Sequence, residues 1–321
     1  MYKPDSEPKR RIHDGNLLTF LRDAAEPNGA DAYDCDPVAG YISEVHVIQG
    51  PMKAAHATRL ARIQENATAR QERQEGEFRE EFGNVRGQRR AEGKEQADVD
   101  GELYVRMVTA LNQANAWLGV DGHLSVTHKS DDWTKGSDLI LTLPGPNGQP
   151  VRLAIDMTVA KSDDVVNKKL DRIFETIKDG KMTTVEYFED PETHQKEKLE
   201  MIPRVVVPIG EEGLQKLRDI TAQFFSGEKR VWGEETGFPK AFLDTIIGEL
   251  EGFIHVLERA AAAKTLPDKA MKNKDHMIEK MRVILAPLRE LRNSKDITKL
   301  GRWELDERQL YVLDYVQGLA A

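Results

Sequence analysis

Between residues 98 and 226 the chain alternates between helical and strand-like patterns in the order helix, strand, strand, strand, helix, strand. Apolar residues at every third or fourth position predict a helix that opens at the capping residues 98–101. Shorter alternating or apolar runs predict four strands, at 123–129, 137–143, 151–160 and 203–210. A helix at 162–180 would cross between the last two strands, and another follows at 211–225. Few topologies accommodate this order, so the sequence predicts a mixed α/β core with the order αβββαβ.

Three other zones flank this core. Residues 1–52 are rich in Pro, Gly and Asp and are expected to form a loosely ordered arm. Residues 53–97 carry ten Lys and Arg among many glutamates, which predicts a long, solvated charged helix. Residues 237–321 show three amphipathic helical patterns, which predict an all-helical C-terminal extension. Pro287 should kink or end the second of these helices.

Composition limits the functional classes. The formal net charge is −9, and the core zone alone has fifteen Lys and Arg against twenty-two Asp and Glu, a net of −7. Such a balance argues against a general nucleic-acid-binding protein, because phosphate contacts need basic residues. The single cysteine, Cys35, is expected to be a bystander in a reducing compartment. No apolar run of membrane-spanning length and no apolar leader is present, so a cytoplasmic protein without a membrane partner is expected.

Two aspartates stand out at neighbouring strands. Asp138 opens the predicted second strand, and Asp156 lies inside the very apolar third strand in the sequence AlaIleAspMetThr. A carboxylate in such a strand needs a partner, because burying an unpaired charge is costly. In a hairpin of the second and third strands these two residues would lie side by side. They are therefore the candidate site, although a turn role for Asp138 and a pairing of Asp156 with Arg152, Lys168 or a backbone amide would also explain them.

This arrangement resembles the PD-(D/E)XK nuclease superfamily, whose core has the same order of elements. Ser137-Asp138 matches the acidic start of the second strand, Asp156-Met157-Thr158 matches the (D/E)-x-K triplet, and Glu102 matches an acidic residue on the opening helix. The resemblance implies that Glu102, Asp138 and Asp156 bind Mg²⁺ or Mn²⁺ for the hydrolysis of phosphodiester bonds in nucleic acid. The pattern around these strands is also similar to uncharacterised proteins predicted from bacteria with very small genomes.

The chain departs from the family pattern at the lysine. Thr158 occupies the lysine position and shares a face with Asp156, because side chains alternate along a strand. Some members of the superfamily supply this lysine from the helix that follows. Lys161, Lys168 and Lys169 are therefore the candidates for a displaced lysine, which would orient water or stabilise charge in the transition state.

Three interpretations remain open. The first is a metal-dependent nuclease with a displaced lysine, in which the Asp138 and Asp156 carboxylates converge. The second is a catalytically inactive domain of the same fold that serves as a binding or assembly module, with self-association or a protein partner through its helical regions. The third is an unrelated α/β interaction protein, for which a different strand order is expected. No zinc-binding spacing, glycine-rich phosphate loop or Ser-His-Asp order occurs in the sequence.

Overall fold

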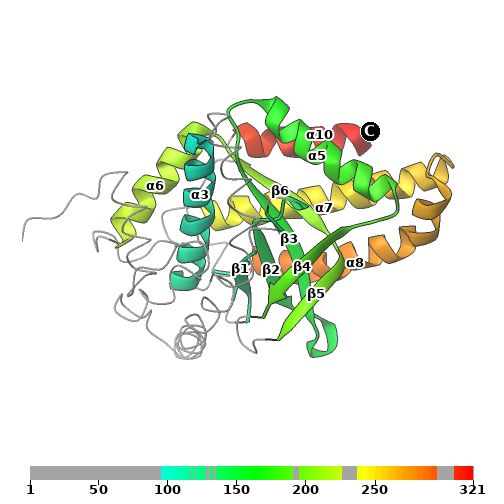
Figure 1. The fold of residues 1–321 in the computed structure, drawn as a ribbon, viewed down its shortest axis with the longest axis horizontal. Coiled ribbons are helices and arrows are strands. Elements are labelled where there is room, and N and C mark those ends of the chain that lie inside the picture. The colour runs from blue at the N-terminus through cyan, green and yellow to red at the C-terminus, as the bar shows by residue number, and fades with distance from the viewer. Residues whose placement is uncertain are drawn as a thin grey trace, which may run out of the picture.

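The structure, a computed structural model, is built around a four-stranded sheet (Figure 1). It describes residues 95–320 except 116, 120, 128–130, 133–134, 191–194, 226–236 and 295–306. The strand order is β1-β2-β3-β6, in which β2 is antiparallel to both β1 and β3 and β6 is parallel to β3. The strands are β1 (His123–Val126), β2 (Leu139–Pro144), β3 (Pro150–Val159) and β6 (Arg204–Ile209). The predicted arm at 1–52 and nearly all of the predicted charged helix at 53–97 lie outside the described residues.

The mixed α/β class is confirmed, and the predicted helices and strands follow one another in the predicted order, with two further strands, β4 and β5, between the second helix and the last strand. A short 3₁₀ turn, η1 (Pro146–Gly148), joins β2 to β3. The helices are α3 (Glu95–Asn115), α5 (Asp163–Lys178), α6 (Glu211–Phe225), α7 (Phe238–Ala262), α8 (Asp268–Arg292) and α10 (Glu307–Ala320).

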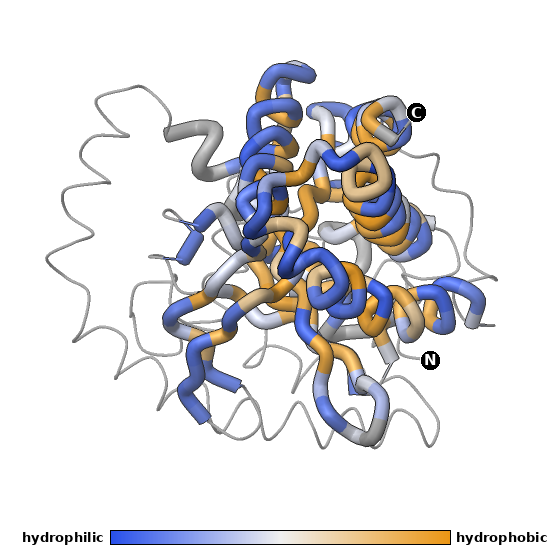
Figure 2. Tube along the Cα trace, turned by 90° about the vertical axis from the view of Figure 1, so that its right-hand side faces the viewer, coloured by the Kyte–Doolittle hydropathy of each residue, from blue (hydrophilic) through white to orange (hydrophobic). Residues whose placement is uncertain are grey.

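The two faces of the sheet have different cover. On one face, side chains of β2, β3 and β6 join α3, α7 and α8 in a single large apolar core, which Figure 2 shows as the orange interior. The C-terminal helices therefore share the core of the α/β region. On the other face, Ile140 and Ala154 pack under a hairpin of two further strands. This second face also carries Asp156, because residues two apart in a strand point the same way.

The covering hairpin was not predicted. It consists of β4 (Thr183–Glu189) and β5 (Lys196–Ile202), which pair antiparallel with two register shifts and lie in front of the sheet in Figure 1. No strand was predicted between residues 181 and 202, where charged residues dominate the sequence. Its apolar side chains, among them Val185 and Leu199, are nevertheless buried against the sheet. The inserted hairpin follows Gly180, which ends α5 with a φ of +68°.

One local prediction was wrong, and one of two alternatives given for Pro287 is excluded. Residues 98–101 lie inside α3 and do not cap it. α8 continues through Pro287 to Arg292, so the proline does not end the helix. Proline removes one backbone donor from a helix, but burial of neighbours such as Leu285 and Leu288 supplies tertiary stabilisation that local preference does not include.

Helix α10 packs closely on α7 because two glycines of α7 leave room for it. A Cβ atom at Gly252 would overlap the side chain of Val316, and one at Gly248 would overlap that of Leu313. Val312 and Val316 are buried at this contact. Close approach of the two helices therefore depends on the missing side chains.

We expect Gly252→Ala to lower the free energy of unfolding by about 1–2 kcal/mol, as measured by urea denaturation. Overpacking typically costs about 1–3 kcal/mol, whereas replacing a helical glycine by alanine gains up to about 1 kcal/mol. Gly101→Ala is the matched control, because no described atom outside the local helix lies within 4 Å of a Cβ at this position. The control should be stabilised, and equal behaviour of the two variants would contradict the close packing of α10.

Candidate functional site

Asp138 lies one residue before β2 and is fixed there by its own backbone and side chain. Its N–H donates to the carbonyl of Ile155 at 2.9 Å, which continues the β2–β3 ladder. Its carboxylate Oδ2 accepts a hydrogen bond of 2.6 Å from the backbone N–H of Met157. The carboxyl group is thereby held against β3, at the point where Asp156 stands.

Asp156 is the buried centre of the site. It lies on β3 with only 3% of its surface exposed and shares its sheet face with Ala154 and Thr158. Its Oδ1 accepts a hydrogen bond of 3.0 Å from the Thr158 hydroxyl and forms an ion pair with the ammonium of Lys169. The need for a partner that the sequence indicated is therefore met by Lys169, and not by Arg152 or Lys168.

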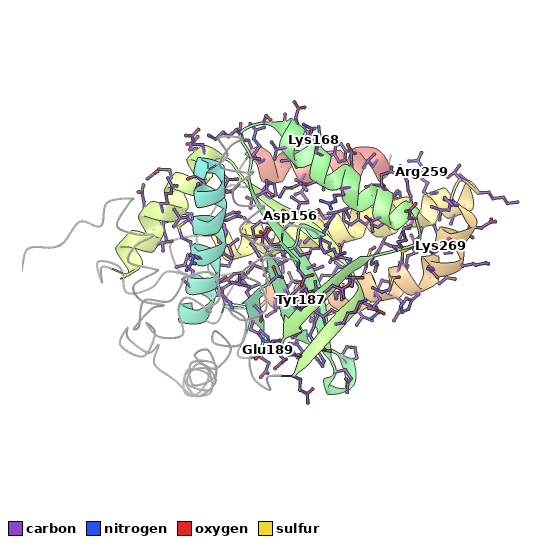
Figure 3. All side chains as sticks on the ribbon, viewed as in Figure 1. Asp156, Lys168, Tyr187, Glu189, Arg259 and Lys269 are labelled. Carbon is purple, nitrogen blue, oxygen red and sulfur yellow. The ribbon has the colours of Figure 1, made fainter. Side chains whose placement is uncertain are left out.

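The structure separates the three candidate lysines. Lys169 projects from the second turn of α5 onto Asp156, whereas Lys161 and Lys168 are exposed. In Figure 3, Asp156 lies in the middle of the molecule and Lys168 lies on α5 at its periphery. Thr158, in the lysine position of the family pattern, acts as a hydrogen-bond donor to Asp156. Of the lysines proposed for the site, only Lys169 makes a described contact with it.

Charges around Asp138 favour a protonated or cation-bound carboxyl. Burial, followed by the carboxylates of Asp132 and Asp156, raises the pKa of Asp138 well above its ordinary value of 3.8. Burial disfavours the ammonium of Lys169, but Asp156 and Asp138 outweigh it and raise the pKa of Lys169 above 10.5. Lys169 is therefore a fixed positive charge at neutral pH, and it cannot serve as a general base there.

Arg204 adds a second cation on the same face. It opens β6 opposite Ala154 in the parallel ladder and is 7% exposed. Its guanidinium donates to the carbonyl of Lys135, and a Cβ at Gly136 would meet Arg204 Nη1 and Asp156 Oδ2, each at 3.3 Å. Burial lowers the pKa of Arg204, and the charges of Asp156 and Asp138 oppose this. Gly136 has a φ of +68°, so it suits both the turn and the close approach of these two side chains.

The segment before Asp138 connects the site to the β4–β5 hairpin. The two carboxylate oxygens of Asp131 accept the backbone N–H groups of Glu186 and Tyr187, each at 3.0 Å. Asp132 hydrogen-bonds to Asp138. Both aspartates lie in a short helical turn, where they have these specific partners.

Glu249 of α7 is a buried carboxyl group behind the site. Its Oε2 accepts a hydrogen bond of 2.9 Å from the N–H of Val206, which stands beside Asp156 in the β3–β6 ladder. Neither Glu249 nor Arg204 was among the site residues predicted from the sequence. Glu249 had a signal, since it occupies an apolar face between Ile246 and Phe253. For Arg204 the only signal in the sequence was its position at the start of an apolar strand.

The residues present suit a Mg²⁺-type ion in part. No group of three or more His, Cys, Asp or Glu side chains within the described ranges is arranged to hold a metal. However, Mg²⁺ is often held by only one or two carboxylates together with water and substrate phosphate. Asp138 and Asp156 supply two such groups, and their mutual repulsion would be relieved by a cation. The side chain of Glu102, the third predicted ligand, lies outside the part of the structure that is described.

Comparison with known proteins gives no match. No protein-family model, no curated protein and no solved structure is similar to this chain at a significant level. Among the described helices, none is both long and apolar enough to span a membrane.

Proposed function

We propose that the protein is a metal-dependent phosphodiesterase of the nuclease-like type, with a site made of Asp138, Asp156 and Lys169. The observation that carries the proposal is the ion pair between Lys169 and the buried Asp156, on the sheet face that Asp138 also occupies. The sequence resemblance lacked a lysine at Thr158. Lys169 brings an ammonium group to the same carboxylate from the neighbouring helix, which is the substitution that some members of that superfamily use.

Asp138 and Asp156 would hold the metal ion, which when bound would polarise the phosphate and lower the pKa of a bound water. Asp138 Oδ2 is engaged by Met157 N–H, and Asp156 Oδ1 by Lys169 and Thr158. Asp156 Oδ2 takes part in neither of the two Oδ1 contacts and would face the cation. At Asp138 a cation would take the place of the hydrogen bond with Asp132. A ligand set of only two carboxylates favours an ion that keeps much of its water, as Mg²⁺ does.

Lys169 would stabilise the negative charge that develops on the phosphate during hydrolysis. Arg204 lies on the same face, and Arg172 is one turn from Lys169 along α5 and within electrostatic reach of Arg204. These cations offset the acidic groups locally in a chain whose formal net charge is −9. They would attract a phosphate group to the site, with Arg172 the exposed residue of the three.

The proposal is tested with Asp156→Asn, which keeps the size of the side chain and removes its charge. We expect the wild type to cleave labelled DNA or RNA in Mg²⁺ or Mn²⁺. We expect Asp156→Asn to lose about 100-fold or more of this activity, together with metal binding in calorimetric titration, because the metal contributes several kcal/mol. Asp275→Asn, at an exposed position of α8, is the control and should keep both.

A second function is favoured by one observation. Asp156 Oδ1 is already satisfied by two donors, so the site can be stable without a metal ion. In that case the domain would be an inactive binding or assembly module that interacts through its helical regions. A wild-type protein that binds metal but does not cleave nucleic acid would favour this module over the nuclease. So would a wild-type protein that neither binds metal nor cleaves.

A further inference from the structure

Helix α10 contacts α5 through three polar pairs, which we call the polar ladder. Arg308 forms an ion pair with Asp163. The Tyr311 hydroxyl donates to Asn167 Oδ1 at 2.8 Å, and the Tyr315 hydroxyl donates to Asp171 Oδ1 at 2.5 Å. Figure 1 shows the two helices side by side at the top of the molecule. All three contacts join segments about 145 residues apart in the sequence.

The spacing of the ladder fixes how α5 is rotated. Its three acceptors on α5 are each four residues apart, so they form one face of the helix. The donors on α10 advance in the same order along the chain, so the two helices run in the same direction. Contacts at three successive turns restrict both rotation of α5 about its axis and sliding along it. Arg308 also donates to the carbonyl of Lys161 at 3.3 Å, which holds the connection from β3 into α5.

Lys169 lies on the opposite side of α5 from this ladder. Successive residues of an α-helix are about 100° apart, so Lys169 is roughly 160° from Asp171 around the axis. A third face, with Val166, Leu170 and Ile173, is buried in the core. Any rotation of α5 would therefore move Lys169 relative to Asp156, which is fixed in the sheet.

We propose that α10 is a positioning element that holds the Lys169 ammonium on Asp156 through the Tyr311 and Tyr315 contacts with α5. This inference rests on the proposed function for its catalytic consequence. A lysine on a strand is placed by the sheet, but a lysine on a helix depends on how that helix is packed. The glycines of α7 that admit Val316 and Leu313 seat α10 against the body of the protein. Burial and the hydrogen bond to Asp171 raise the pKa of Tyr315 to about 12, so its hydroxyl remains a donor at neutral pH.

The test is the double variant Tyr311→Phe/Tyr315→Phe in the full chain, which removes two ladder bonds and keeps both rings. Brief acylation of the folded protein with acetic anhydride, read by mass spectrometry, reports how accessible Lys169 is relative to the exposed Lys168. We expect this ratio to rise about fivefold, the factor that one typical hydrogen bond represents. We also expect kcat for cleavage to fall about tenfold, which is within the effect of displacing a catalytic group by about 1 Å. KM should change less than about twofold.

Arg289→Gln is the matched control, because it also removes two hydrogen bonds between C-terminal helices, here from α8 to Glu251 of α7. It should leave the acylation ratio and kcat unchanged. Asp171→Asn keeps an acceptor for the Tyr315 hydroxyl and should behave as the wild type, whereas Asp171→Leu should resemble Tyr315→Phe. This rescue separates positioning from a general loss of stability.

The outcomes of the two proposals are distinguishable. An acylation ratio that stays at the wild-type value in the double variant would overturn the positioning role, whether or not the protein cleaves nucleic acid. A ratio that rises in a protein whose wild type cleaves no substrate would support the positioning of Lys169 and count against the nuclease proposal alone. A fall in kcat that Arg289→Gln reproduces equally would also overturn the positioning role.

Discussion

Replacing Lys169 by methionine is expected to lower kcat for phosphodiester cleavage by about 100- to 1000-fold, the range seen when one preorganised donor to a developing charge is removed. Methionine keeps the length of the side chain and removes its charge. Lys168→Met is the matched control, because Lys168 is the adjacent residue of α5 and is exposed. It should lower kcat less than about twofold.

The same variant separates catalysis from metal binding. The Lys169 ammonium is bonded to Asp156 Oδ1, so it competes with a cation for that carboxylate. Calorimetric titration should therefore show Mg²⁺ affinity equal to or higher than that of the wild type, while cleavage is lost. A simple loss of folding would remove both. Equal activity losses in the Lys168 and Lys169 variants, or a Lys169→Met protein that cleaves normally, would contradict the assignment of Lys169.

The choice between the two lysines was within reach of the sequence. Val166, Leu170, Ile173 and Ile177 define the buried face of α5 from their spacing alone. At about 100° per residue, Lys168 points almost directly away from that face and Lys169 lies at its border. A lysine that reaches a buried aspartate has to start from the border. The helical pattern therefore favoured Lys169. The sequence motif alone did not distinguish it from Lys161 and Lys168.

The main sheet was predictable because its apolar strands differ in period from the helices around them. β3 was predicted within a residue at each end, and its register with β2 brought Asp138 beside Asp156 as expected. The β4–β5 hairpin was missed because one of its faces is charged and exposed, as at Glu186 and Lys198. Only the other face packs, so overall hydrophobicity was a poor guide and alternation was the relevant signal.

Contacts between distant segments lay beyond any local pattern. The carboxylate of Asp131 binds the backbone of β4, more than fifty positions further along the chain. In the sequence, Tyr311 and Tyr315 are typical residues of an amphipathic helix. Their hydrogen bonds are evident only when α5 lies beside them. Such pairs depend on the packing of whole helices, which periodicity does not specify.

Glu249 is a buried carboxyl group whose replacement should lower the stability of the fold. Its side chain is fully buried, and its Oε2 holds the N–H of Val206 on the outer edge of β6. Its other oxygen has no hydrogen-bond partner in the described part of the chain. Burial raises the pKa of Glu249 well above its ordinary value of 4.5. We expect Glu249→Ala to lower the free energy of unfolding by about 1–3 kcal/mol, because the Val206 N–H is left buried without an acceptor.

The sign of the pH dependence follows from the raised pKa. The unfolded chain releases the Glu249 proton near pH 4.5, whereas the folded chain retains it to a higher pH. The stabilising contribution is therefore complete below pH 4.5 and is lost as the pH rises towards the folded pKa, by about 1.4 kcal/mol per unit. Asp138 has a raised pKa as well and contributes in the same direction. The contribution of Glu249 is therefore obtained from the difference in unfolding free energy between a variant and the wild type at each pH, and not from the wild-type pH curve alone.

Glu249→Gln provides that difference, because glutamine keeps an acceptor for Val206 and has no proton to lose. Urea denaturation between pH 4.5 and 8 should show a shallower decline for this variant than for the wild type, so that the variant gains in relative stability as the pH rises. Glu251→Gln is the control on the same helix, since Glu251 is exposed and pairs with Arg289. Its curve should run parallel to the wild type. If the Glu249→Gln curve is also parallel, the carboxyl group is ionised in the folded protein and a negative charge stands behind Asp156. A cation at the site would then have a further electrostatic reason to bind, and Mg²⁺ affinity should fall in Glu249→Gln.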